Sequence, residues 1–325
     1  LASPLHGQLT LDEELLEGFR WRSVGPTNMG GRVTDVEGLP SPSTTFYVAA
    51  AAGGIWKTTN NGTTFRPLFQ EERVVSMGDL AIAPSDPEQV WAGTGEEDSR
   101  NSISPGGGVY RSMDGGETWE LMGLEETEVI GRIVVHPENP DIVFVAALGH
   151  IWDANPERGL YRTTDGGETW ELVKFISDEA GFVDVIFRPG DPDVLFASSW
   201  ERVRGPYFLE SGGPGSALWK STDGGDTWTE VVGNGFPETL KGRIGLDISR
   251  SDPDVVYAMV EAEEPEPEEG DAAAPAEPME DEPTEGEQAE AEQAGEGAES
   301  GVTPGGSGLY RSDDGGETWR KVNDA

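Results

Sequence analysis

The 325-residue sequence contains no cysteine and only three histidines. The lack of cysteine excludes disulfide bonds and thiolate metal ligands, and His6, His136 and His150 are too scattered to suggest a metal centre. The sequence also lacks the Gly-x-Ser-x-Gly motif of serine hydrolases and the Gly-x-x-x-x-Gly-Lys motif of phosphate-binding loops. We therefore expect no metal ion and no cofactor.

Basic residues are scarce as well. The sequence has 22 Lys and Arg against 62 Asp and Glu, which gives a net charge of −40. A surface of this charge repels nucleic acids and anionic membranes. No apolar run reaches the eighteen residues that a membrane-spanning helix needs. We therefore expect neither nucleic-acid binding nor membrane insertion, and the acidic surface favours a secreted or periplasmic protein.

Glycine and proline are abundant, and the sequence repeats one motif, Ser/Thr-x-Asp-Gly-Gly-Glu/Asp-Thr-Trp. Four copies are complete, and a fifth is degenerate at Thr58–Phe65. The Asp or Asn positions of the five copies are Asn60, Asp114, Asp165, Asp223 and Asp314. The tryptophans that end the complete copies are Trp119, Trp170, Trp228 and Trp319. Repeats of about fifty residues indicate an architecture of stacked units.

Each unit predicts four short strands. An apolar–aromatic–basic–hydroxyl step such as Val109–Ser112 precedes the motif, and a β-branched stretch ending in an aromatic residue comes earlier. Turn residues separate these stretches. Within the motif, Asp accepts hydrogen bonds from backbone amides ahead of it, and Gly supplies a positive φ. We therefore interpret the motif residues as structural.

The motif resembles the Asp-box (BNR) repeat of sialidases, sortilin, family-74 xyloglucanases and the photosystem II assembly propellers. This resemblance implies an all-β fold, a β-propeller of four-stranded antiparallel blades in which the box joins the third and fourth strands. On that template the propeller spans 20–325, and its five blades cover about 30–70, 72–124, 129–175, 181–234 and 242–323.

We expect the five blades to be part of a six- or seven-bladed ring, because Phe19–Val24 resembles a fourth strand with no strands before it. A closed five-bladed ring with a stray N-terminal strand is the alternative. Because the sequence begins at Leu1 rather than Met, we expect a processed or truncated start. Residues 1–19 predict a tail with a short helix that begins at a Thr10–Glu13 capping box.

An acidic segment interrupts the fifth unit. Residues 261–300 hold 17 Asp and Glu and no Lys or Arg. Such a composition cannot bury enough apolar surface to offset its chain entropy. We therefore predict a disordered loop over 261–307, inserted between the second and third strands of the fifth blade.

Two tryptophans are not explained by the strand pattern. Trp152 and Trp200 follow second strands, in predicted loops that also carry Arg202 and Arg204 and open on the same face as the Glu96–Arg100 loop. Exposed aromatic residues mixed with charges are typical of surfaces that bind sugars or peptides. Packing of these loops against the blades is the alternative interpretation.

Arg32, Arg132 and Arg243 each follow a glycine at the start of a first strand. In sialidases, which the sequence resembles, three arginines hold the substrate carboxylate. A bidentate guanidinium suits that task. Because the three arginines recur at one point of the repeat, packing between repeats explains them more simply than ligand binding, and we favour that interpretation while keeping both.

The resemblance to family 74 bears on catalysis. In that family an acidic catalytic residue occupies the position held here by Ala51, and a second acid comes from another propeller. Glycoside hydrolysis ordinarily needs two carboxylates. The remaining candidates are Asp35, Glu96, Asp153 and Glu201.

The sequence therefore predicts a binding module for a polysaccharide or an extracellular protein or peptide, without catalysis of its own. One alternative is a xyloglucanase- or sialidase-like glycoside hydrolase whose site is completed by missing sequence. Another is an assembly chaperone like the photosystem II propellers.

Overall fold

The computed structural model describes residues 32–98, 100, 103–150, 152–265 and 305–324. These residues form β-strands and turns, with no helix among them. The helix predicted after Thr10, the strand predicted at 19–24 and most of the predicted acidic loop lie outside the described residues.

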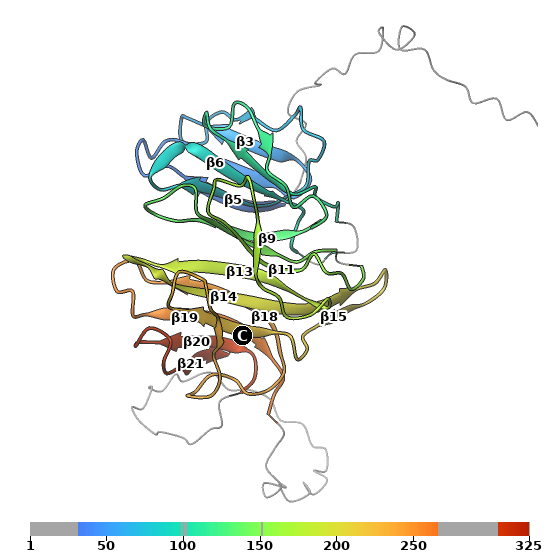
Figure 1. Cartoon of the computed structure of the whole chain (residues 1–325), viewed down its shortest axis with the longest axis vertical. Helices are drawn as coiled ribbons and strands as arrows, with labels where there is room; N and C mark the ends of the chain where they lie inside the picture. Colours follow the sequence, from blue (N-terminus) through green and yellow to red (C-terminus); the bar gives the residue numbers. More distant parts are fainter. Residues whose placement is uncertain (1–31, 99, 101–102, 151, 266–304, 325) are drawn as a thin grey trace, which may run out of the picture. The chain divides into compact units, whose positions relative to one another are not determined.

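The strands form five antiparallel sheets, each built from consecutive strands (Figure 1). Sheet one contains β1 (Val33–Gly38), β2 (Phe46–Ala50), β3 (Gly54–Thr58) and β4 (Arg66–Pro67). Sheet two contains β5 (Met77–Ala83), β6 (Asp86–Thr94), β7 (Val109–Ser112) and β8 (Glu120–Leu121). Sheet three contains β9 (Ile130–Val135), β10 (Val143–Ala147), β11 (Gly159–Thr163) and β12 (Glu171–Lys174). Sheet four contains β13 (Ala180–Arg188), β14 (Asp191–Arg204), β16 (Ala217–Ser221) and β17 (Thr229–Glu230), and β15 (Leu209–Ser211) pairs with the end of β14. Sheet five contains β18 (Lys241–Ile248), β19 (Val256–Ala262), β20 (Gly308–Ser312) and β21 (Arg320–Asp324).

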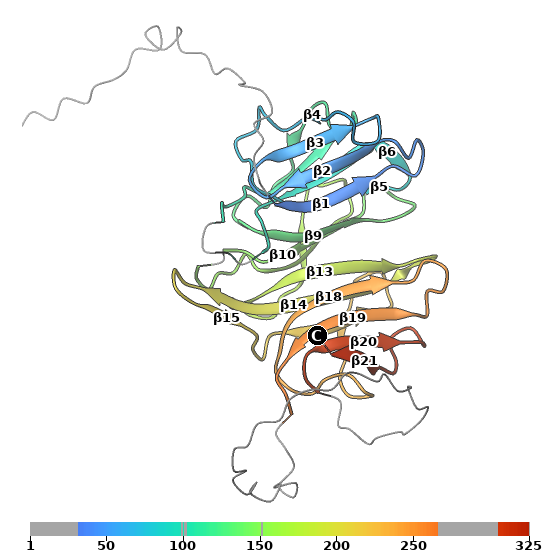
Figure 2. The same ribbon diagram turned by 180° about the vertical axis from the view of Figure 1, so that it is seen from behind.

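The sheets stack in chain order, as the first strands show in Figure 2. Every extended contact between described strands of different sheets joins sheets that are consecutive in the chain. Buried apolar side chains fill each of these joints, for example Tyr47 with Met77 between sheets one and two. The prediction of an all-β fold of four-stranded antiparallel blades is confirmed. The larger ring stays a prediction.

Parts of the predicted acidic loop belong to sheet five. Glu261 and Ala262 end β19, and Ser307 both donates to the Ala262 carbonyl and accepts from its amide at 3.0 Å. The ladder between β19 and β20 therefore holds the two ends of this segment together.

Each Asp box is a hydrogen-bonded turn between the third and fourth strands. In the second box, Oδ1 of Asp114 accepts the amide of Thr118 at 2.9 Å, and Oδ2 accepts the Thr118 hydroxyl at 2.6 Å. The Ser112 hydroxyl donates to Asp114 and accepts the amide of Gly116. Asp165, Asp223 and Asp314 repeat these bonds, and Asn60 retains the bond to the Thr64 amide. The box residues therefore shape turns, as the sequence indicates.

These bonds make the fold sensitive to acid. The hydrogen bonds from Thr118 lower the pKa of Asp114 to about 2, and equivalent bonds do the same for Asp165, Asp223 and Asp314. A carboxyl group whose pKa is lower in the folded state contributes stability above its unfolded pKa, near 4, and loses it as the pH falls. We therefore expect the melting temperature to fall between pH 4 and pH 2, as measured by circular dichroism.

The Asp114→Asn variant tests the origin of this effect. Asn60 shows that an amide oxygen keeps the bond to the following Thr amide. The variant should therefore fold and lose less stability between pH 4 and pH 2 than the wild type. An unchanged acid profile would contradict the assignment to the boxes.

The boxes also join neighbouring sheets. In each of the first four sheets, an aromatic residue of the second strand and a basic residue of the third strand lie opposite each other in the ladder; we call them the aromatic–basic pair. The four pairs are Tyr47–Lys57, Trp91–Arg111, Phe144–Arg162 and Phe196–Lys220. In each pair the cationic group lies 5.0–6.0 Å from the ring centroid.

The second glycine of the following box lies against that ring. A Cβ at Gly225 would come within 2.5 Å of Phe144, and one at Gly316 within 2.7 Å of Phe196. Real Cβ atoms do not approach so closely, and both glycines also have φ above 80°. These two positions therefore require glycine for the joint as well as for the turn.

Candidate ligand-binding face

The sheet topology separates two edges of the molecule. In each sheet the second strand ends and the third begins at one edge, and the third strand ends in the Asp box at the other. We call these the loop edge and the box edge. Trp152 and the residues Glu96–Asp98 follow second strands, so they lie at the loop edge.

Trp152 is exposed on a loop that a buried arginine fixes through hydrogen bonds. Its side chain is 45% exposed, as an accessible ligand-binding residue requires. Arg158, which is fully buried, donates to the carbonyls of His150 at 2.9 Å and Asp153 at 3.0 Å. It also donates at 2.7 Å to the carbonyl of Glu179, the residue before β13. Burial lowers the pKa of Arg158. This buried guanidinium fixes the loop that presents Trp152.

The prediction that Trp200 lies in a loop is wrong. β14 continues to Arg204, and Trp200 is buried within it, packed with Val129, Leu148 and Val183. Its indole donates to the Ser211 hydroxyl at 3.0 Å. Trp200 therefore belongs to the packing beneath the loop edge. The charged residues after Trp200 are typical of a loop, but the strand continues through them because Arg202–Arg204 pair with β15.

β14 and β15 form a hairpin with an aromatic tip. Arg202, Val203 and Arg204 pair with Ser211, Glu210 and Leu209. The Gly205 amide donates to the Phe208 carbonyl, and Arg204 donates to the same oxygen. Tyr207 at the tip is 99% exposed, and Phe208 is half exposed. Neither aromatic residue was among the candidates that the sequence singled out.

Two of the three predicted carboxylate-binding arginines contact the acidic segment 96–98, which follows β6. Arg32 of sheet one makes a bidentate pair with the buried Glu96. Arg243 of sheet five donates to Glu97 at 2.8 Å and to Asp98 at 3.0 Å. Coulombic attraction to Glu97, together with the hydrogen bonds to both acids, offsets burial and raises the pKa of Arg243. The segment 96–98 of sheet two thus joins sheets one and five at the loop edge.

Arg202 also contacts this segment. It is fully buried in β14 and donates to the Glu97 carbonyl at 2.7 Å. The guanidinium groups of Arg202 and Arg243 lie 4.8 Å and 5.5 Å from the Trp200 ring centroid. Burial lowers the pKa of Arg202, and Arg158 and Arg243 lower it further. Arg202, Arg243, Trp200 and Glu97 therefore form one buried network of contacts beneath the loop edge.

Arg132 binds carboxylates along the first strands rather than at the loops. It contacts Asp79 of β5 at 3.3 Å and Asp184 of β13 at 3.1 Å. Asp79 accepts the Ile133 amide at 2.7 Å, and Asp184 accepts the Leu246 amide at 2.9 Å. Each carboxylate therefore links the first strand of its own sheet to that of another. Burial raises the pKa of both aspartates, and Arg132 opposes that rise. Arg32, Arg132 and Arg243 thus do not converge on one ligand position.

The four candidate catalytic carboxylates have different surroundings. Glu96 is paired with Arg32, and Glu201 accepts the Gly215 amide at 2.8 Å. Asp35 accepts the Leu80 amide, and burial raises its pKa. Asp153 is exposed and lies 3.5 Å from His150. Among the described residues, no cluster of three or more His, Asp or Glu could hold a metal ion. No described helix is long and apolar enough to cross a membrane.

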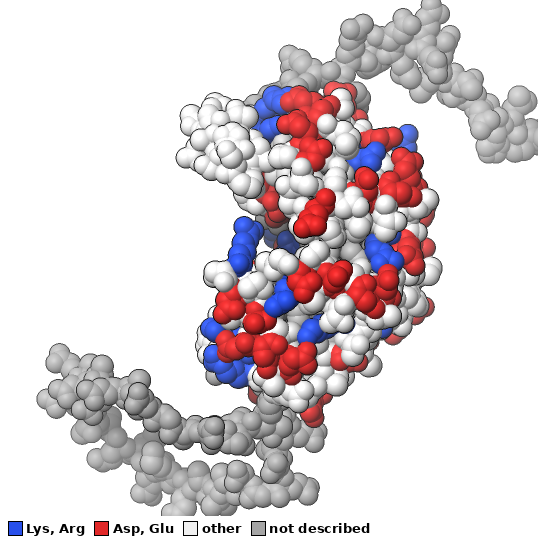
Figure 3. Space-filling view, turned by 60° about the vertical axis from the view of Figure 1, so that its left-hand side comes forward, with Lys and Arg blue, Asp and Glu red and all other residues white. Residues whose placement is uncertain are grey.

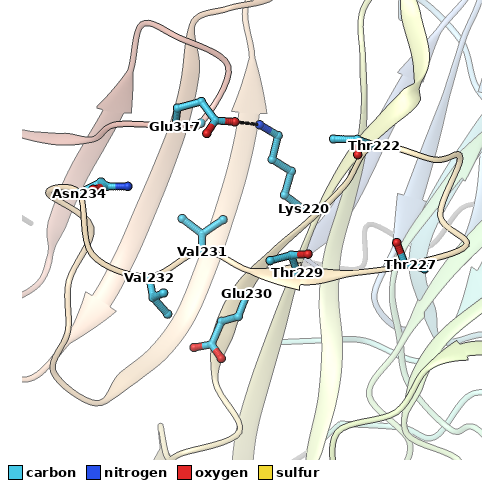
Figure 4. Close-up of a pocket in the computed structure, with 10 residues that line it drawn as sticks. Lys220, Thr222, Thr227, Thr229, Glu230, Val231, Val232, Asn234 and Glu317 are labelled. Carbon is cyan, nitrogen blue, oxygen red and sulfur yellow. Dashed lines mark hydrogen bonds and ion pairs between the residues drawn. The ribbon is translucent and has the colours of Figure 1, made fainter.

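The surface and one of its cavities are visible in two further views. In Figure 3, Asp and Glu cover much of the visible face, with Lys and Arg between them. In Figure 4, Lys220 points toward Glu317 across a cavity of about 290 Å³, also lined by Thr229 and Asn234. The ion pair is 2.6 Å long and joins sheets four and five at the box edge. This cavity therefore belongs to a joint between sheets.

The stacked sheets and their boxes define the class: an Asp-box β-propeller protein. The sortilin (neurotensin receptor 3) family model matches residues 107–261, and the BNR/Asp-box repeat model matches residues 310–321.

Curated relatives are xyloglucanases. The chain is 25% identical over 246 residues to a xyloglucanase of a Paenibacillus species, covering 67% of this chain and 22% of that protein. It is 26% identical over 248 residues to the xyloglucanase Xgh74A of Acetivibrio thermocellus, covering 66% of this chain and 27% of that protein. The chain thus spans about a quarter of the length of these relatives.

A solved structure supports the same fold. The crystal structure of the GH74 enzyme of Niastella koreensis superposes with a TM-score of 0.58 and 18% identity. The superposition covers 90% of this chain and 38% of that one.

Proposed function

We propose that this chain is a secreted or periplasmic polysaccharide-binding module without catalysis of its own, and that its ligand contacts the loop edge. The observation that carries the proposal is the set of exposed aromatic side chains there, Trp152, Tyr207 and Phe208. Flat aromatic rings held in a fixed position offer large contact areas to a ligand at little entropic cost. The similarity to xyloglucanases favours a sugar polymer over a peptide as the ligand.

Two features support the proposed lack of catalysis. Ala51, at the position that the family-74 resemblance assigns to an acid, is buried and cannot transfer a proton. The remaining candidate carboxylates each have a different partner: Arg32 for Glu96, the Gly215 amide for Glu201, the Leu80 amide for Asp35 and His150 for Asp153. Glycoside hydrolysis needs two carboxyl groups on either side of one bond.

Binding is tested with xyloglucan oligosaccharides by isothermal titration calorimetry. We expect Trp152→Ala to weaken binding by about fivefold or more, because truncating an aromatic anchor commonly costs above 1 kcal/mol. Met113→Ala is the matched control, since Met113 is similarly exposed but lies at the box edge. Equal affinities of the wild type and the Trp152 variant would refute the proposed face.

The alternative function is glycoside hydrolysis, which the xyloglucanase relatives favour. A reducing-sugar assay on the same oligosaccharides separates the two functions. Turnover by the wild type that disappears in Glu201→Gln would establish the hydrolase and overturn the proposal.

A further inference from the structure

The sequence contains two Asn-Gly steps, and both asparagines have a left-handed backbone. Asn61–Gly62 lies in the Asp box of sheet one, and Asn234–Gly235 lies in the loop between β17 and β18. φ is 57° at Asn61 and 51° at Asn234. Glycine leaves its main-chain nitrogen sterically open to attack the side-chain carbonyl carbon of the preceding asparagine. The two steps therefore share one chemistry and differ in their surroundings.

The joint between sheets four and five fixes the residues of the second step. The Trp319 amide of sheet five donates to the Asn234 carbonyl at 2.8 Å. A Cβ at position 235 would come within 1.9 Å of the Trp319 carbonyl oxygen, and Gly235 has φ 89°. Position 235 therefore requires glycine, and asparagine is among the few other residues that tolerate the φ of position 234. The reactive step is thus a consequence of this joint.

The two glycine amides differ in their hydrogen bonds. The Gly62 amide donates to the Thr58 hydroxyl at 3.0 Å. The Gly235 amide donates to no acceptor within the part of the chain that the structure describes. Asn234 is exposed and lies at the cavity that Glu317 also lines (Figure 4). The attacking nitrogen is therefore engaged after Asn61 and lacks a described partner after Asn234.

The four complete Asp boxes contain the analogous Asp-Gly step, which reacts through the same cyclic imide. In each of them the amide of the first glycine donates to a main-chain carbonyl at 2.8–3.0 Å; these glycines are Gly115, Gly166, Gly224 and Gly315. The turn of the box thus keeps the attacking nitrogen occupied. Asn234–Gly235, which lies outside any box, does not have this protection.

We propose that Asn234 is a site of spontaneous deamidation. The Gly235 nitrogen bonds to Cγ of Asn234, the bond from Cγ to Nδ2 breaks, and Nδ2 leaves as ammonia with the proton of the Gly235 amide. Water then opens the succinimide ring. Addition of water at Cγ gives Asp, and addition at the main-chain carbonyl carbon gives isoaspartate, in which the chain runs through Cγ.

Either product weakens the joint between sheets four and five. Asp adds a negative charge to a cavity that Glu230 and Glu317 already line. In isoaspartate, the carbonyl that accepts the Trp319 amide becomes part of a free carboxylate, and the main chain is one methylene longer. Phe236 packs on Trp319 with the ring centroids 5.2 Å apart, so the longer chain also disturbs this core contact.

Ageing of the full chain in mildly alkaline buffer at physiological temperature tests the proposal. Trypsin releases residues 58–73 and 221–241, each with one Asn-Gly step, and mass spectrometry measures the conversion of amide to carboxylate in both peptides. In the folded chain we expect Asn234 to react about two- to tenfold faster than Asn61, the effect of one intramolecular hydrogen bond. In guanidinium chloride both steps lose their folded surroundings, and the two rates should converge.

Three variants separate the causes. Thr58→Val removes the acceptor of the Gly62 amide, so it should raise the rate at Asn61 and leave the rate at Asn234 unchanged. Asn234→Gly keeps the main-chain carbonyl and tolerates the φ but has no side-chain amide, so its melting temperature should stay constant while that of the wild type falls on ageing. Asn61→Gly is the matched control and should age like the wild type.

Two results would overturn the proposal. One is a rate at Asn234 that equals or falls below the rate at Asn61 in the folded wild type. The other is a melting temperature of Asn234→Gly that falls on ageing as much as that of the wild type. Circular dichroism of each fresh variant establishes that it is folded before ageing begins, and the comparison of the two wild-type peptides does not depend on any variant.

Discussion

Phe196→Ala is expected to lower the free energy of unfolding by about 3–5 kcal/mol, the range for removing a buried aromatic side chain from a core. Phe196 is fully buried in β14, where it packs with Ile244 and Trp319 of sheet five. Truncation would remove both its own contacts and the surface on which Gly316 rests. Urea unfolding followed by tryptophan fluorescence measures the change.

Tyr257→Ala provides the matched comparison. Tyr257 holds the equivalent position in sheet five, is only partly buried and receives no box within the described residues. Its truncation should cost clearly less than that of Phe196. Equal losses of stability in the two variants would show that the contact between Phe196 and the Asp box of sheet five contributes nothing to the joint.

Arg132→Met is expected to cost about 2–3 kcal/mol at pH 7, because it leaves Asp79 and Asp184 buried without a counter-charge. Breaking a fully buried pair costs about 3–5 kcal/mol, but the Arg132 side chain is 40% exposed, so water screens part of the loss. Chemical denaturation at several pH values measures the difference.

The pH dependence identifies the cause. Burial raises the pKa of Asp79 and Asp184, and loss of Arg132 should raise both further. A carboxyl group with a raised folded pKa destabilises the fold as the pH rises through that pKa and does not do so below its unfolded pKa, near 4. The deficit of Arg132→Met should therefore shrink from pH 7 toward pH 4.

Asp79→Asn in the Arg132→Met background is the control. The asparagine oxygen can still accept the Ile133 amide that Asp79 accepts at 2.7 Å, while one uncompensated charge is removed. The double variant should recover part of the stability at pH 7. A further loss would contradict the electrostatic explanation.

The fold was predictable because its signals are local. Asp114 and Thr118 lie four residues apart and bond within one turn, so the motif alone specifies the geometry. The aromatic and basic positions that precede each box also recur at fixed spacing, although the sequence does not reveal that they contact the Asp box of the next sheet.

The candidate site was less predictable because its contacts are distant in sequence. Arg243 and Glu97 lie 146 residues apart, and no local pattern indicates their pairing. The same holds for Arg132, whose two carboxylate partners come from the sheets on either side. Trp152 is exposed, as one of its two interpretations expects, because it follows a strand whose pattern is complete, whereas Trp200 continues a strand beyond the usual length.

The recurrence of one joint geometry has an evolutionary consequence. Each sheet presents the same receiving surface to its successor and the same turn to its predecessor, so an internal duplication would create an interface that is already compatible. Gene segments encoding single sheets could be gained or lost without inventing new packing. Selection could then adjust the number of repeats separately from the loops at the opposite edge, which would be free to diverge toward new ligands.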